Sequence, residues 1–260
     1  MSPAIEQQST RFNYRLDGPT AAPVLVLSNS LGADLTMWER QMAAFSQRFR
    51  VLRYDSRGHG ATPATTGPYS IPQVARDVIG LLDALSIPRA HFCGLSMGGM
   101  VGMWLGVNAP ERIDRLLLCN TSPKIGTPEM WNARIDKVRA GGVDSIADAV
   151  LERWFTAPFR QREPQTVARM RAIMVAIPAE GYCASCAAVR DMDQRDAIGA
   201  ISRRTLVIAG AHDVSTPPAD GRGMAQVIPG AGFVEIDAGH ISNVEASAAF
   251  TAAALEFLDR

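Results

Sequence analysis

The chain has 260 residues, 26 basic and 26 acidic side chains, and therefore a formal net charge of zero. This length can bury a large core, as one domain or as a domain with an insertion. The balanced charge gives no sign of nucleic acid or an anionic membrane surface as a partner. The N-terminal segment from Met1 to Glu6 lacks the charged-then-apolar pattern of a signal peptide. The four cysteines fit a reducing cytoplasm.

Short apolar runs alternate with helical patterns over the first 120 residues. A continuous apolar run such as 23–27 is typical of a strand buried on both faces, as in parallel sheets. The alternation predicts a mostly parallel sheet with crossover helices. In chain order we expect eight strands, at 5–9, 11–16, 23–27, 51–54, 89–93, 113–119, 204–209 and 232–236. We expect core helices at 37–48, 71–85, 97–108, 219–227 and 246–258.

The pattern changes between residues 121 and 203, where strand-like runs stop and only helical patterns remain. We expect helices at 131–140, 143–155, 166–177 and 182–191, with breaks at Gly141-Gly142, Pro158, Pro164 and Pro178. We interpret this region as a helical cap inserted after the sixth strand. The predicted division is therefore a core at 1–120 and 204–260 and a cap at 121–203.

One uncharged stretch, from Ala90 to Pro110, approaches the length of a membrane span. It contains five glycines together with the polar Ser96 and Asn108. We interpret it as a buried strand followed by a buried helix inside a protein that does not span a membrane. The C-x-x-C formed by Cys183 and Cys186 has no second pair, so we predict no metal site there.

The strongest chemical signal is the sequence from Gly94 to Gly98, a G-x-S-x-G between a predicted strand and a predicted helix. This pattern is typical of a nucleophile elbow, which holds its serine in a strained conformation above the end of a sheet. We expect glycine at both ends because a Cβ there would collide with the neighbouring turn. The pattern therefore predicts Ser96 as a nucleophile.

A serine hydroxyl needs a base beside it, and histidine is the usual base because its pKa lies near neutral pH. Among the four histidines, His91 lies inside a predicted strand, and we interpret His59 as structural. His212 could serve, but it leaves no role for the later histidine. His240 follows the last strand, so its loop leaves the same edge of the sheet as the elbow. We predict His240 as the base.

The histidine needs a carboxylate to fix its tautomer and to stabilise its charged form. Asp213 follows the seventh predicted strand, next to the strand before His240. Asn120 follows the sixth strand but cannot carry a charge, and Asp237 is too close to His240 along the chain to turn onto its ring. We therefore predict a triad of Ser96, Asp213 and His240.

An oxyanion hole should complete the site. One donor is expected to be the backbone amide of Met97, directly after the nucleophile. The second should come from the loop after the third strand, which runs from Asn29 to Gly32. We assign this second donor to the amide of Leu31.

With these parts in place, the chain resembles the α/β-hydrolase superfamily along nearly its whole length. The order Ser96, Asp213, His240 is the one expected there. Within it, the chain resembles the 3-oxoadipate enol-lactonase family, through Asn29-Ser30 where many hydrolases have His-Gly and through the ending Gly239–Asn243. The segments that carry the resemblance are 28–32, 53–60, 94–99, 211–213 with 216–218, and 239–245.

The resemblance implies an α/β-hydrolase fold and hydrolysis of 3-oxoadipate enol-lactone to 3-oxoadipate, in bacterial breakdown of aromatic acids. It implies no metal and no organic cofactor, and a small-molecule lactone as the partner. Two alternatives stay open: another serine hydrolase, such as a carboxylesterase, a C–C bond hydrolase or a perhydrolase, or a receptor that keeps the triad and signals through its cap. A halide- or epoxide-cleaving relative is disfavoured because those proteins use an aspartate where Ser96 stands. The oligomeric state stays open.

The lactone implied by the resemblance carries a free carboxylate, which would be costly to bury unpaired. The triad has no cation, so the partner should come from the cap or a neighbouring loop. Trp131 and Arg134 are the best candidates because residues three apart on a helix share a face. Trp131 would cover the lactone ring while Arg134 binds the carboxylate. The alternative is that Arg134 is a solvated cap residue and Trp131 a packing residue.

Overall fold

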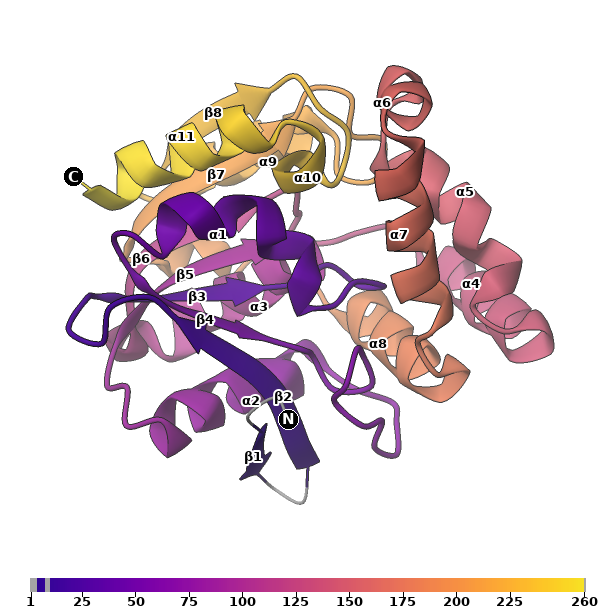
Figure 1. Ribbon diagram of the computed structural model, residues 1–260, viewed down its shortest axis with the longest axis horizontal. Coiled ribbons are helices and arrows are strands. Elements are labelled where there is room, and N and C mark those ends of the chain that lie inside the picture. The colour runs from indigo at the N-terminus through magenta and orange to yellow at the C-terminus, as the bar shows by residue number, and fades with distance from the viewer. Residues whose placement is uncertain (1–3, 8–9, 260) are drawn as a thin grey trace.

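The computed structural model describes residues 4–7 and 10–259. A twisted sheet with helices on both faces forms one part, and five helices between β6 and β7 cover one end of that sheet (Figure 1). The strand order is β1-β2-β4-β3-β5-β6-β7-β8. The strands are β1 (Ala4–Gln7), β2 (Thr10–Asp17), β3 (Val24–Ser28), β4 (Arg50–Tyr54), β5 (Ala90–Leu95), β6 (Ile113–Cys119), β7 (Arg204–Gly210) and β8 (Gly232–Ile236).

The mostly parallel sheet contains seven strands, β2 to β8, and our expectation of eight was wrong on this count. All neighbours from β4 to β8 are parallel, and β2 is antiparallel to β4. β1 pairs only with 10–13 of β2, whereas β4 pairs with 14–17, so β1 forms a hairpin that lies beyond the edge of the sheet. Residues 8 and 9 of the first expected strand lie outside the described residues.

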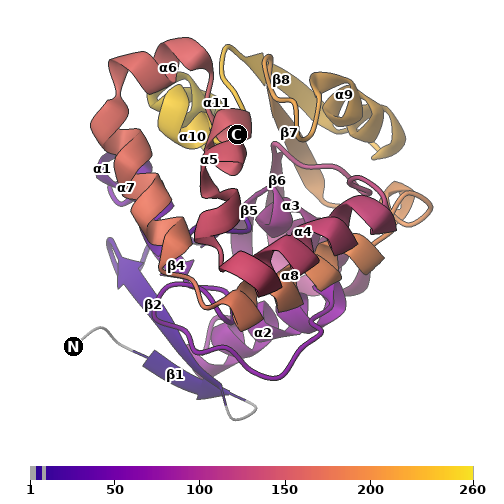
Figure 2. The same cartoon turned by 90° about the vertical axis from the view of Figure 1, so that its right-hand side faces the viewer.

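Helices cover both faces of the sheet. Helices α1 and α11 lie on one face, and α2, α3 and α9 lie on the other (Figures 1 and 2). The bounds are η1 (Leu35–Trp38), α1 (Glu39–Phe45), α2 (Ile71–Ala84), α3 (Met97–Asn108), η2 (Pro110–Arg112), η3 (Ile198–Ala200), α9 (Pro218–Val227), α10 (Ser242–Glu245) and α11 (Ser247–Asp259). The predicted helix at 97–108 and the strands at 113–119 and 232–236 are confirmed at both ends.

The uncharged stretch from Ala90 to Pro110 forms β5 and α3 in the centre of the protein, as predicted. Every residue of β5 is buried. A Cβ added to Gly102 would lie 3.0 Å from the Phe92 ring, and one added to Gly106 would lie 3.1 Å from Leu116. The glycines therefore let α3 approach β5 and β6 closely. Across the described residues no single helix is long and apolar enough to cross a bilayer; one bent pair, Pro164–Val175 with Ala179–Asp191, meets the length and composition test only together.

The cap consists of α4 (Pro128–Gly141), α5 (Asp144–Trp154), α6 (Ala157–Arg162), α7 (Pro164–Val175) and α8 (Ala179–Asp191). We did not predict α6, because we took Pro158 and Pro164 only as helix breaks. Both prolines lie in the first turn of a helix, where the missing N–H has no intrahelical partner and the fixed φ favours the helix. Helix α10, also unpredicted, is a single turn directly after the His240 loop.

Candidate active site

The G-x-S-x-G stretch forms a sharp turn between β5 and α3. Ser96 adopts φ 57° and ψ −114°, a backbone conformation that non-glycine residues seldom take. A Cβ at Gly94 would lie 2.1 Å from the carbonyl oxygen of Gly98, and one at Gly98 would lie 2.2 Å from that of Ser28. Both glycines are thus required by close backbone approach, which lets β3, β5 and α3 meet beneath the serine.

The loops after β7 and β8 bring Asp213 and His240 together. The Nδ1 of His240 lies 2.7 Å from Oδ2 of Asp213, and the two side chains are 4% and 0% exposed. Asp213 also accepts hydrogen bonds from the Thr216 hydroxyl (2.7 Å) and from the amides of Ser215 (2.8 Å) and Thr216 (3.0 Å). An ionised carboxylate held this way fixes the histidine tautomer with Nδ1 as the donor.

Electrostatics keeps Asp213 ionised. Burial by itself would raise its pKa, but the charge of His240 and hydrogen bonds from His240, Thr216 and Asn120 outweigh burial and lower the pKa to about 2. The carboxylate therefore stays charged throughout the neutral range, as a partner of a histidine base requires.

Asn120, at the end of β6, supports this carboxylate. Its Nδ2 donates to Asp213 Oδ2 (3.0 Å) and to the carbonyl of Gly239 (3.2 Å), and its Oδ1 accepts from the Ser242 hydroxyl at 2.5 Å. Asn120 adopts φ 44°, a conformation that asparagine tolerates better than most residues. Sequence reasoning treated this position only as a place where a second acid is missing; the structure shows an amide that bridges Asp213 and the His240 loop.

The other histidines have different partners. The Nε2 of His212 lies 2.8 Å from Asp237, and both side chains are largely exposed. His91 is buried in β5, with its ring 5.7 Å from that of Phe49. His59 is fully buried and belongs to the loop after β4. Asp237 therefore contacts His212, whereas Asp213 contacts His240.

The loop after β3 is held by a turn within the loop and by contacts with two other segments. The carbonyl of Asn29 accepts from the amide of Gly98 (3.0 Å), and the amide of Ala33 donates to Ser30 (3.2 Å). The amide of Gly32 donates to Nε2 of His59 at 3.2 Å, while Nδ1 of the same ring lies 3.3 Å from the carbonyl of Arg57. This turn places Leu31 at the cavity beside Ser96 and Met97.

His59 can make both contacts only as a neutral ring, donating from Nδ1 and accepting at Nε2. Burial lowers its pKa to about 4, against smaller opposing contributions from the Arg57 carbonyl and Asp34. The sequence suggested a structural role for His59, and the structure identifies what it holds, the backbone next to Leu31.

The cavity between the sheet edge and the cap has a volume of about 250 Å³. Ser96, His240, Leu31 and Met97 line its floor, and cap residues form its walls. The other lining residues are Ser30, Met100, Ile125, Gly126, Met130, Trp131, Arg134, Val150, Arg153, Trp154, Tyr182, Val189, Val214 and Ser215. The structure thus brings every sequence-predicted site residue except the buried Asp213 to one cavity.

Two arginines reach this cavity from different cap helices. The guanidinium carbon of Arg134, on α4, lies 4.8 Å from the Trp131 ring centre, and its side chain contacts the buried Tyr182 hydroxyl. Trp131 is fixed by a hydrogen bond from its indole N–H to the Ile125 carbonyl, at 2.8 Å. Arg153, on α5, is exposed. Sequence reasoning missed Arg153, because only the folded cap shows that α5 faces the same space as α4.

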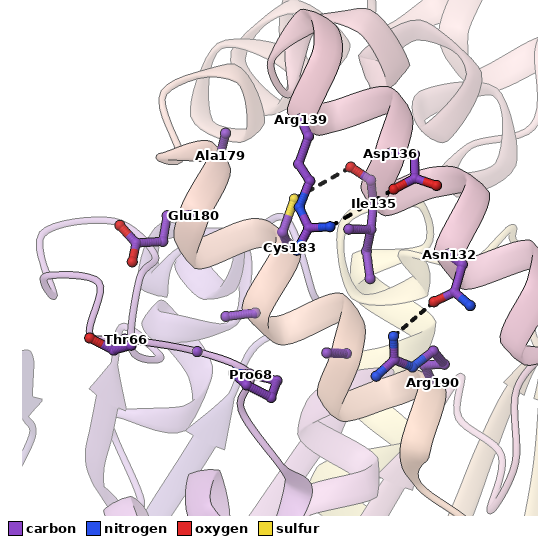
Figure 3. A pocket seen from close by; sticks show the side chains of 13 residues that line it. Thr66, Pro68, Asn132, Ile135, Asp136, Arg139, Ala179, Glu180, Cys183 and Arg190 are labelled. Carbon is purple, nitrogen blue, oxygen red and sulfur yellow. Dashed lines mark hydrogen bonds and ion pairs between the residues drawn. The ribbon is translucent and has the colours of Figure 1, made fainter.

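A larger groove, of about 870 Å³, lies on the outer side of α4 and α8 (Figure 3). Ile135 and Cys183 lie on its floor, and Arg190 donates to Asn132 across it at 2.8 Å. None of the triad residues lines it. We place the active site in the smaller cavity because Ser96 and His240 line it, although the other groove is larger.

Comparisons with known proteins identify the family of this chain. The family described as alpha/beta hydrolase fold matches residues 23–247. Two curated proteins of Acinetobacter baylyi, 3-oxoadipate enol-lactonases 2 and 1, are 43% and 38% identical to this chain; the alignments cover 94% and 92% of this chain and 91% and 90% of theirs. The crystal structure of the enol-lactonase from Burkholderia xenovorans LB400 is 49% identical, with a TM-score of 0.98 over 99% of this chain and all of that one.

Proposed function

We propose that this chain, which belongs to the α/β-hydrolase family, hydrolyses 3-oxoadipate enol-lactone to 3-oxoadipate through an acyl-enzyme on Ser96. The observation that carries the chemistry is a cavity lined by both Ser96 and His240, with His240 bonded to Asp213 at 2.7 Å. The substrate is taken from the names of the relatives that align over nearly the whole chain.

The reaction would begin with transfer of the Ser96 proton to Nε2 of His240, because Nδ1 is already bonded to Asp213. Ser96 Oγ attacks the lactone carbonyl, and the amides of Leu31 and Met97 stabilise the oxyanion. When the ring C–O bond breaks, the leaving enol oxygen takes a proton from His240 and the enol relaxes to the ketone. Water that gives a proton to His240 then attacks the acyl ester. The bond to Ser96 Oγ breaks, Ser96 takes the proton back from His240, and the second carboxylate of the product is released.

We further propose that Trp131 covers the lactone ring and that Arg134 binds the free carboxylate of the substrate. Both residues line the cavity that holds Ser96, and Trp131 is 5% exposed. Stacking of the Arg134 guanidinium on the indole reduces its rotational freedom while leaving its N–H groups able to bind an anion. Arg153 offers a second cation, on the neighbouring cap helix α5.

The division into a core at 1–120 and 204–260 and a cap at 121–203 belongs to the same proposal, with the chemistry in the core and substrate selection in the cap. We also propose the cytoplasm as the compartment and a small-molecule lactone as the partner. The thiols of Cys93 and Cys119 are free and their Sγ atoms lie 3.8 Å apart, which fits a reducing compartment.

A panel of esters tests the substrate assignment. Purified protein should give its highest kcat/KM for the carboxylated enol-lactone, at least about tenfold above the uncharged methyl ester of the same lactone and above short p-nitrophenyl esters. The lactone and its methyl ester share the reacting carbonyl, so their ratio isolates the carboxylate. Equal values for both lactones, or a preference for simple esters, would instead favour a general carboxylesterase.

A further inference from the structure

Glu245, the last residue of α10, joins the cap to the loop that carries His240. Its Oε2 accepts hydrogen bonds from the amide of Gly239 (3.0 Å) and from the amide of Thr156 (3.2 Å). Its Oε1 accepts from the Thr156 hydroxyl. Gly239 directly precedes His240, whereas Thr156 lies at the start of α6 in the cap. One carboxylate thus joins the cap to the His240 loop, and Thr156 lies 89 residues before Glu245 in the sequence.

The backbones of the same two segments are also in direct contact. The amide of Ile241, directly after His240, donates to the carbonyl of Trp154 in the cap at 3.1 Å. The amide of Gly239, directly before His240, donates to the Glu245 carboxylate. A Cβ at Gly239 would lie 2.8 Å from the Trp154 carbonyl oxygen and 3.4 Å from Cα of Phe155. The cap segment at 154–156, where α5 ends and α6 begins, therefore lies against Gly239 with no room for a side chain.

We propose that Glu245 is a positioning residue that sets the His240 ring through a cap-dependent contact with Thr156. The carboxylate accepts from three donors, and charge-assisted hydrogen bonds of this kind are stronger and more directional than neutral ones. Asp213 fixes the ring from its Nδ1 side, and the Gly239 and Ile241 contacts fix the backbone that carries it. This segment of the cap then serves proton transfer as well as substrate binding. The inference rests on the proposed role of His240 as the base.

A double-mutant cycle on Glu245→Gln and Thr156→Val tests this coupling. The assay uses a neutral p-nitrophenyl ester, so that it can be read even where the enol-lactone assignment fails. Each single variant should lower kcat by about tenfold with KM changed less than about twofold, because a displaced base slows proton transfer without removing a substrate contact. The double variant should be no slower than the slower single variant, since both changes act on the shared Glu245–Thr156 contact. Thr156→Ser, which keeps the hydroxyl, should restore most of kcat.

Two control variants alter hydrogen bonds elsewhere in the cap, one made by a carboxylate and one made by a hydroxyl. Asp148→Asn breaks a carboxylate bond to Arg171 between α5 and α7, and Ser145→Ala breaks a hydroxyl bond to the Gly142 carbonyl. Both should keep kcat within about twofold of the parent, and thermal unfolding checks that all variants are folded. Effects of Glu245→Gln and Thr156→Val that multiply in the double variant, that fall on KM alone, or that the control variants reproduce would overturn the proposal.

Discussion

The edge of the sheet and the wall of the cap hold their polar side chains in different ways. At the sheet edge, Asp213 accepts hydrogen bonds from His240, Asn120, Ser215 and Thr216, and every one of these contacts is at least partly buried. In the cap wall, Arg134 is half-buried and rests on the face of Trp131, and Arg153 is exposed. The sheet edge is therefore fixed by many directional bonds, whereas Arg134 in the cap wall contacts only the Trp131 ring and the Tyr182 hydroxyl among the contacts described above.

From this difference we infer that catalysis and substrate selection can be changed independently. Substitutions at the sheet edge should reduce turnover of every ester, because they alter groups that act on the reacting carbonyl. Substitutions in the cap wall should change which ester is preferred. Thr156 is the exception that the structure predicts, since it belongs to the cap by sequence but contacts the His240 loop through Glu245.

The largest effect is expected for Ser96→Ala. Loss of the nucleophile should lower kcat by on the order of 10⁴-fold or more on the lactone and on neutral esters alike. The strained elbow is built by Gly94 and Gly98, so circular dichroism should show an unchanged fold. A variant that keeps a tenth of its activity on either substrate would mean that Ser96 is not the nucleophile.

Asp213→Asn should come next, with a loss on the order of 10⁴-fold in kcat, because an amide neither fixes the tautomer nor stabilises the charged ring. Adding Asn120→Asp should recover part of the loss, since the Asn120 amide already lies 3.0 Å from Asp213. Asp237→Asn is the matched control and should have little effect, because Asp237 contacts the exposed His212. Greater damage from Asp237→Asn would refute the assignment of the acid.

The pH dependence of the free energy of unfolding tests whether His59 is held as a neutral ring. Its folded pKa of about 4 lies below the ordinary value of 6.5, so the unfolded chain binds more protons between these values. The contribution of neutral His59 is therefore complete above about pH 6.5 and is lost as the pH falls towards 4. Between about pH 7 and pH 4.5 the free energy of unfolding should fall by about 2 kcal/mol more in the parent than in His59→Gln. Parallel urea-unfolding results for both proteins would show that His59 does not titrate in this way.

The smallest effect, and the most selective, is expected for Arg134→Met. KM for the carboxylated lactone should rise at least about tenfold, a loss of about 1.4 kcal/mol or more, while a neutral p-nitrophenyl ester is turned over at an unchanged rate. Arg153→Met, assayed on the same pair, shows whether the second cation shares the task. Equal effects of Arg134→Met on both substrates, or none on either, would show that Arg134 does not bind the carboxylate. They would also contradict the assignment of substrate selection to the cap wall.

Much of the sheet edge could be predicted from the sequence because its requirements are local. An elbow needs Gly94 and Gly98 within four residues of each other, and parallel strands place the loops that follow them at one edge of the sheet. His240 and Asp213 could be chosen by their positions after strands alone. The family and the fold followed from the same short motifs.

The remaining features depend on contacts between distant segments. The bridge made by Asn120, the His59–Gly32 bond and the Glu245–Thr156 contact all join residues that no short window of sequence contains. Proline also misled us at Pro158, because the same residue can end one helix and begin another. The cap wall was the least predictable part, since the faces of its helices are set by packing among themselves.

The most direct test of the account is the ultraviolet absorbance of the conjugated enol-lactone during incubation with purified protein. We predict loss of the chromophore at a rate proportional to the concentration of the protein, and a rate equal to the spontaneous one for Ser96→Ala at the same concentration. Loss of the chromophore at the spontaneous rate with the parent protein, while the same preparation cleaves a neutral ester, would contradict the proposed substrate and leave only a serine hydrolase of other specificity.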